Sequence, residues 1–320
     1  MKKARKVIAL VCSFMLLFAL CACGAEKAKD EFVVGVCQLV QHDALDAATQ
    51  GFQDALNDKL GDKVRIEVKN ASGDSANCAT IVNGFVSEKV DLIMANATPA
   101  LTAAASATAD IPILGTSVTA YGVALDIDDF SGTVGGNISG TSDLASLEEQ
   151  AAMIREWFPD AQNVGLLFCS AEANSRYQVD VVKAELEAMG VTCTEFAFTD
   201  TNDVGSVTQA AADASDVLYV PTDNVAASNA EAIANILIPA GVPAVCGEEN
   251  ICAGCGVCTL SISYYDLGYT TGEMAVRILT GEADISEMPV GFTTATKKYN
   301  ADMCAQLGIE PIEGYEAIEK

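Results

Sequence analysis

The chain has 320 residues, with 44 acidic and 18 basic side chains and a formal net charge of −26 at pH 7. This strong negative charge argues against nucleic acid and anionic membrane surfaces as partners, because both would repel the protein. The length is greater than one hydrophobic core usually holds, so two domains are expected.

The first 22 residues predict a secretory signal peptide. A basic opening, MKKARK, precedes the apolar run VIALVCSFMLLFAL, which is too short for a comfortable membrane span. The following Leu20-Cys21-Ala22-Cys23 resembles the lipobox of bacterial lipoproteins, whose last cysteine is acylated. We therefore expect an exported protein, anchored to the outer face of the cell membrane by a lipid on Cys23, with a polar linker at 23–31. An ordinary signal peptide with incidental cysteines is the alternative.

From residue 32 onward, runs typical of buried strands alternate with amphipathic helices. The first half predicts strands at 32–39, 64–69, 91–95 and 111–115, and helices at 43–60, at 75–88 and from Thr98-Pro99 onward. The second half repeats this order, with strands at 163–168, 191–197, 216–220 and 242–246, and helices at 174–189, at 203–214 and after 221–224. Further helices are predicted at 143–158, between the halves, and at 266–279, after them.

This alternation predicts an α/β fold with two Rossmann-like lobes, each built on a parallel sheet. Neither half contains a Gly-rich phosphate loop, which disfavours nucleotide chemistry, and no cofactor is expected. The sequence also contains no nucleophile elbow and no zinc-protease helix, so we do not expect an enzyme.

Ligands of open α/β sheets bind beyond the carboxyl ends of the strands, so the loops of the two lobes should face each other across a cleft. Those loops are rich in hydroxyl, amide and carboxylate side chains and poor in aromatic ones, which weakly disfavours a sugar. The candidate ligand-binding residues are Gln41, His42, Thr98, Ser117, Thr119, Asn174, Thr222, Asp223, Asn224 and Glu248.

If the ligand is an amino acid, its two charges need different partners. The N–H groups of the helix that Thr98 opens would suit the carboxylate, with Ser117 and Thr119 adding donors. Asp223 and Glu248 would accept from the ammonium. Splitting the charges between the lobes would make closure depend on the ligand. Each residue could equally be a solvated loop residue or a helix cap.

Six stretches, in order, resemble the substrate-binding lipoproteins of ABC importers, and in particular the tryptophan/tyrosine-type branch with a type I periplasmic-binding-protein fold. They cover the chain from about residue 31 to 309. They read VGVCQLVQHDALDAATQGF, ATPALTAAASATADIPILGTSVT, NISGTSDLASLEEQ, SAEANSRYQ, DVLYVPTDN and SISYYDLGYTTGEMAVRIL.

The resemblance implies a receptor whose lobes are joined by a hinge of three crossing strands and close on one small molecule. An aromatic amino acid is the ligand that the resemblance favours. The closed receptor, a monomer, would deliver this ligand to an ABC permease in the membrane. A branched-chain amino acid, a sugar, a nucleoside or a sensory role remain alternatives. The implied crossovers lie near 136–141, 261–264 and 291–295, which gives lobe 1 as 32–138 plus 264–292 and lobe 2 as 139–263 plus 293–320.

Two departures from the family's pattern leave the exact ligand open. Relatives usually have an acid where Ser263 stands, so Ser263 is kept as a candidate ligand-binding residue. Relatives also commonly have Asp-Pro where Ala120-Tyr121 stand.

The stretch NICAGCGVCTL places Cys252, Cys255 and Cys258 at the spacing of iron–sulfur ligands. No Cys-Pro follows, although Cys246 could supply a fourth ligand if the loop folds back. The resemblance implies an ordinary loop before a strand here. We therefore predict no metal site. A metal site at the triplet, a disulfide between Cys246 and one of the three, and unpaired thiols are the alternatives.

Overall fold

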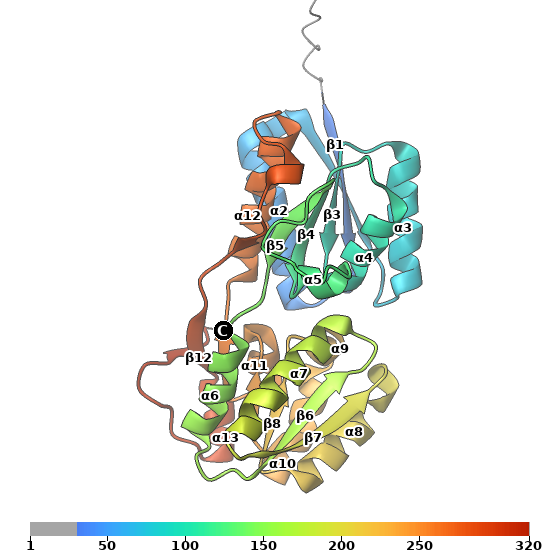
Figure 1. Ribbon diagram of the computed structural model, residues 1–320. Helices are drawn as coiled ribbons and strands as arrows, with labels where there is room; N and C mark the ends of the chain where they lie inside the picture. Colours follow the sequence, from blue (N-terminus) through green and yellow to red (C-terminus); the bar gives the residue numbers. More distant parts are fainter. Residues whose placement is uncertain (1–30, 320) are drawn as a thin grey trace, which may run out of the picture.

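The computed structural model describes residues 31–319 and divides into two α/β lobes, drawn one above the other in Figure 1. The predicted fold class is confirmed, because each lobe is built on its own mainly parallel sheet. The predicted signal peptide, the lipidated Cys23 and the linker up to residue 30 lie outside the described residues. No helix in the described part of the chain is long and apolar enough to cross a membrane.

The first lobe contains a six-stranded sheet in which all neighbouring strands are parallel. Both faces of such a sheet are covered, which explains the near-continuous apolar runs in its central strands. In spatial order the strands are β11 (Gly291–Phe292), β5 (Ile138–Ser142), β4 (Ile113–Val118), β3 (Leu92–Asn96), β1 (Phe32–Gln38) and β2 (Val64–Asn70).

Helices cover the two faces of this sheet in separate groups, each with its own buried core. One core includes residues of α3 (Ser75–Glu88), α4 (Thr98–Ala107) and α5 (Tyr121–Ala124). The other includes residues of α2 (Asp43–Leu60) and α12 (Tyr264–Leu279). Two short 3₁₀ helices, η1 (Gly61–Lys63) and η2 (Ile285–Glu287), complete the lobe.

The second lobe contains a seven-stranded sheet, parallel except where β10 meets β12. In spatial order the strands are β13 (Glu316–Ala317), β12 (Thr296–Tyr299), β10 (Cys258–Ser261), β9 (Ala244–Cys246), β8 (Val217–Val220), β6 (Asn163–Cys169) and β7 (Thr192–Phe198). Its helices are α6 (Leu147–Trp157), α7 (Ala173–Ala188), α8 (Thr201–Ala214), α9 (Asn224–Ser228), α10 (Ala230–Ala240), α11 (Glu249–Cys255) and α13 (Ala301–Leu307).

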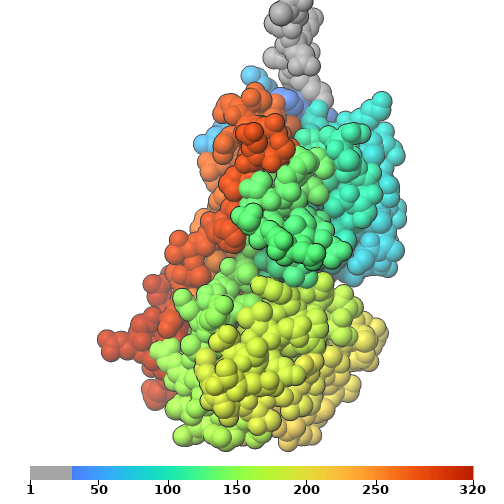
Figure 2. Space-filling view, in the orientation of Figure 1, coloured from blue at the N-terminus to red at the C-terminus, as the bar shows by residue number. Residues whose placement is uncertain are grey.

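The chain passes between the lobes three times, at residues 143–146, 262–263 and 293–295. The first passage lies later than expected. Residues 139–142 were assigned to the second lobe, but they pair with β4 and belong to the first sheet. The helix expected from residue 143 begins only at Leu147, because the Ser146 hydroxyl accepts a hydrogen bond from the Glu149 N–H and caps it. In the space-filling view the lobes meet directly, and the orange-to-red chain descends beside them (Figure 2).

Helices α2 and α12 cross at backbone contact, and glycines permit this close approach. A Cβ atom built on Gly268 would lie 1.9 Å from the Ala48 carbonyl oxygen, and one on Gly51 would lie 2.1 Å from the Tyr265 carbonyl oxygen. No side chain fits in either space. The crossing therefore holds α12 against the first lobe, although the chain reaches α12 from the second lobe.

We expect Gly268→Ala to lower the free energy of unfolding by about 1–3 kcal/mol or more, because the methyl group forces the helices apart. Gly205→Ala is the matched control, since Gly205 also lies within a helix but has open space around it. Removing glycine's conformational freedom there should stabilise the protein by about 0.5–1 kcal/mol. Urea unfolding of both variants tests this, and equal stability of the two would contradict the close crossing.

Candidate functional site

The carboxyl ends of the two sheets face each other across a narrow pocket whose free volume, about 10 Å³, is roughly that of one water molecule. Side chains from both lobes and from the first two passages of the chain line this interlobe pocket. Eight of the predicted ligand-binding residues come together in its wall. They are His42, Ser117, Thr119, Asn174, Thr222, Asp223, Asn224 and Glu248.

Three predicted residues lie elsewhere. Gln41 is exposed on the surface. Thr98 lies in the first turn of α4, which borders a separate groove of about 430 Å³, so the helix end expected to hold a carboxylate is not part of the pocket wall. Ser263 caps α12, because its hydroxyl oxygen accepts a hydrogen bond from the Asp266 N–H at 3.2 Å. An acid at this position would also cap a helix.

Ser117 reaches the pocket because the end of β4 is irregular. The register between β4 and β5 shifts between Gly115 and Val118, and Ser117 has a φ of +53°. A residue other than glycine is strained in this left-handed conformation, and such strained residues cluster at functional sites. The Ser117 hydroxyl is buried without a hydrogen-bond partner.

Asp143 and Tyr264 also line the pocket, although the sequence did not single them out as ligand-binding residues. They lie at two different passages between the lobes, and the Tyr264 hydroxyl donates to Asp143 Oδ2 at 2.9 Å. Asp143 Oδ1 is buried without a partner. Burial raises the pKa of Asp143 to about 6. An acid directly after the polar run SGTS was the available signal, but the predicted helix concealed it.

The two predicted acids of the second lobe act as helix caps. The carboxylate of Asp223 accepts from the Cys169 N–H at 2.6 Å and from the Ala226 N–H at 2.8 Å. That of Glu248 accepts from the N–H groups of Asn250 and Ile251. Burial raises the pKa of each acid to about 7. Their oxygens are thus engaged with the backbone, which favours Asp143 over them as an acceptor for a ligand.

A fourth buried acid, Glu172, stands behind the wall of the pocket. Its oxygens accept from the side-chain amides of Asn174 and Asn224 and from the backbone N–H groups of Asn224 and Val225. Neither lysine nor arginine occurs among the described residues that line the pocket. This electrostatic arrangement suits a ligand group that is positively charged or rich in hydrogen-bond donors.

One hydrogen bond joins the lobes across the pocket. His42 Nε2 lies 3.3 Å from Asn224 Oδ1, and His42 Nδ1 is buried without a partner. Burial lowers the pKa of His42, and the hydrogen bond to Asn224 opposes this shift. The imidazole is therefore neutral at pH 7, so that one ring nitrogen donates and the other accepts.

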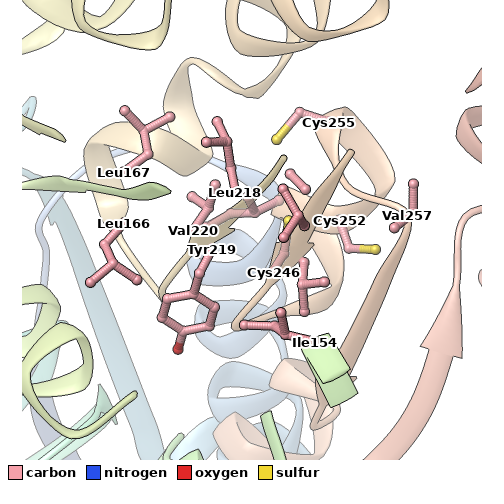
Figure 3. Packing of buried hydrophobic residues seen from close by; sticks show 14 of the residues in the cluster. Ile154, Leu166, Leu167, Leu218, Tyr219, Val220, Cys246, Cys252, Cys255 and Val257 are labelled. Carbon is pink, nitrogen blue, oxygen red and sulfur yellow. The ribbon is translucent and has the colours of Figure 1, made fainter. Parts of the chain in front are cut away.

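The cysteine triplet lies in the core of the second lobe rather than in a loop. Cys252 and Cys255 belong to α11 and Cys258 opens β10, while Cys246 ends β9 beside them (Figure 3). All four are buried free thiols. Burial raises the pKa of Cys252 to about 11, which keeps it protonated. Between residues 31 and 319 no group of three or more His, Cys, Asp or Glu side chains is placed to hold a metal ion.

Two α/β lobes with a polar pocket between their sheets are the architecture of two-lobed substrate-binding proteins. The family model of the ABC transporter substrate binding protein matches residues 33–313, and the chain therefore belongs to this family. The resemblance found in the sequence is confirmed.

Relatives agree with this assignment. A curated relative from Clostridioides difficile (strain R20291), named tyrosine-binding protein, is 34% identical over 263 residues, which are 80% of this chain and 75% of that one. An ABC domain from Streptococcus pneumonia, solved in complex with L-Trp, is 31% identical with a TM-score of 0.85, covering 90% of this chain and 100% of that one.

A third relative has been solved in an open form. The ligand-free, open structure of a substrate-binding protein with adhesive properties from Clostridium difficile is 34% identical and covers 90% of this chain and 99% of that one. Its TM-score is nevertheless only 0.69, against 0.85 for the L-Trp complex. In overall structure the chain is therefore more similar to the L-Trp complex than to this open structure.

We expect Asp143→Asn to flatten the pH dependence of stability. The folded-state pKa of Asp143, about 6, is above its ordinary value of 3.8. The stability linked to its proton is fully present below pH 3.8 and is lost as the pH rises through about 6. Over this window the free energy of unfolding of the variant should fall less, or rise more, with pH than that of the wild type.

Urea unfolding at a series of pH values measures this difference directly. Asp129→Asn, which removes an exposed acid, is the control and should follow the wild type. Parallel curves for the wild type and Asp143→Asn would show that Asp143 titrates normally in the folded protein.

Proposed function

We propose that this protein is the extracytoplasmic solute receptor of an ABC importer, which closes on an aromatic amino acid and delivers it to a membrane permease. One observation carries the proposal. Four polar atoms of residues that line the pocket are buried and have no hydrogen-bond partner. They come from both lobes and from a passage between them. They are His42 Nδ1, Ser117 Oγ, Asp143 Oδ1 and Asn174 Oδ1.

Unpaired buried polar atoms are costly, at about 1–3 kcal/mol each, and proteins seldom retain them in clusters. A ligand that bonds to atoms of both lobes would offset this cost only when the lobes are closed. Binding and closure would then be coupled, as a receptor that presents its closed form to a permease requires. The relatives named for tyrosine and solved with L-Trp support an aromatic amino acid as the ligand.

A thermal-shift screen of the purified protein against amino acids, sugars and nucleosides tests this proposal. We expect L-tryptophan, L-tyrosine or L-phenylalanine to raise the melting temperature, because a ligand at about 100 times its Kd adds roughly 2.7 kcal/mol of stability. Ser117→Ala should weaken that ligand's binding, and Ser106→Ala, on the neighbouring α4 and outside the interlobe pocket, should not. A response only to sugars, nucleosides or branched-chain amino acids would reject the aromatic ligand and retain the receptor.

We also propose that residues 1–22 are removed during export and that Cys23 receives the lipid. The lipobox-like run before Cys23 supports this, and two acyl chains are enough for stable anchoring. In bacteria grown with a labelled fatty acid, the wild-type protein should carry the label and Cys23→Ala should not. Cys21→Ala is the matched control and should remain labelled. Labelling of Cys23→Ala would assign the anchor to another position.

A further inference from the structure

The orientation of two side-chain amides decides what the pocket offers a ligand. Asn174 and Asn224 both donate through Nδ2 to Glu172 Oε2, at 3.0 and 2.7 Å. Glu172 Oε2 also accepts from the Asn224 N–H and Oε1 accepts from the Val225 N–H, so both oxygens act as acceptors and the NH₂ group of each amide faces Glu172. The Thr222 carbonyl oxygen, 3.2 Å from Asn174 Nδ2, imposes the same orientation on Asn174. Each amide therefore directs its oxygen away from Glu172.

The two amide oxygens have different destinations. Asn174 Oδ1 is buried without a partner in the pocket wall. Asn224 Oδ1 faces His42 Nε2 across the lobes, so the imidazole must carry its proton on Nε2. A neutral ring protonated on Nε2 has a lone pair on Nδ1, which is the buried nitrogen without a partner.

We propose that Glu172 is a positioning residue that gives the pocket a fixed acceptor polarity and so makes the receptor select ligands with a primary ammonium group. This inference rests on the proposed receptor function and deepens it. Through the two amides, Glu172 sets both Asn174 Oδ1 and His42 Nδ1 as acceptors, and Asp143 Oδ1 is a third. A primary ammonium carries three N–H donors and a positive charge, which matches three acceptors of which one is a carboxylate.

The three acceptors come from different parts of the fold. His42 belongs to the first lobe, Asn174 to the second, and Asp143 to the first passage between them. One ammonium group would thus bridge the lobes. A ligand that lacks N–H donors would leave these acceptors unpaired in the closed form, and a pocket of this kind discriminates strongly against such analogues.

The ring of His42 reports on this arrangement directly, because His42 is the only histidine in the chain. We expect ¹⁵N NMR of the protein at pH 7 to show one tautomer, protonated on Nε2. Glu172→Gln keeps the shape of the side chain but can donate, so that Asn224 is free to turn over. We expect that variant to show a mixture of tautomers or the Nδ1–H form. Glu187→Gln, which changes an exposed acid on α7, should resemble the wild type.

A ligand series tests the selectivity separately. Isothermal titration would compare L-tryptophan with its Nα-trimethylated derivative, which keeps the charge and the indole but has no N–H donor on the amine. We expect the derivative to bind at least about tenfold more weakly, since charged hydrogen bonds are lost. We also expect Glu172→Gln to reduce this difference, whereas Glu187→Gln should not.

The NMR spectrum and the titration distinguish failure of the aromatic ligand from failure of the role proposed for Glu172. If none of L-tryptophan, L-tyrosine and L-phenylalanine binds, the aromatic ligand is rejected, while the histidine spectrum still decides the role of Glu172. A wild-type ring protonated on Nδ1, or identical tautomers in the wild type and Glu172→Gln, would overturn the positioning role. Equal binding of L-tryptophan and its trimethylated derivative would overturn the selection of a primary ammonium.

Discussion

The backbone contact between α2 and α12 is the constraint on which the rest of the structure depends. Helix α12 follows the second passage between the lobes, and glycines hold it directly against α2 of the first lobe. Its first residue, Tyr264, is therefore fixed relative to the first sheet. The Tyr264 hydroxyl in turn holds Asp143, at the first passage, in the wall of the pocket. A packing requirement between two helices thus sets the position of a carboxylate at the first passage between the lobes.

The sequence was sufficient to predict the two-lobed fold because the periodic elements are long. Helices α2 and α3 have the predicted bounds, since their apolar faces are clear and Asp74 caps α3. The predicted lobe boundary was wrong at β5, whose sequence ISGTS is short and polar. Its buried hydroxyls are satisfied by tertiary contacts: Thr141 Oγ1 lies 3.2 Å from Thr116 Oγ1 and 2.7 Å from Thr271 Oγ1. No pattern within one strand reveals partners so distant in sequence.

The candidate site was predictable in outline for a related reason. Loops after parallel strands meet at one edge of a sheet, and eight of the expected residues do line the pocket. The roles of individual residues were not predictable, because a carboxylate at a helix start serves equally as a cap or as a ligand contact. Ser263 and Asp223 prove to be caps, and only the coordinates show that Asp143 retains an unpaired oxygen.

The use of helix ends explains how several acids can stand around a pocket lined by no lysine or arginine among the described residues. Asp223 and Glu248 cap α9 and α11, and Glu172 accepts from two N–H groups at the start of α9. The N–H groups and the positive ends of these helix dipoles take the place of counter-charges. Asp143 has no helix end, and its carboxylate accepts from the Tyr264 hydroxyl. Asp143 alone of the four has a buried oxygen without a partner, so a cationic group that enters the pocket can bond to it without displacing a helix cap.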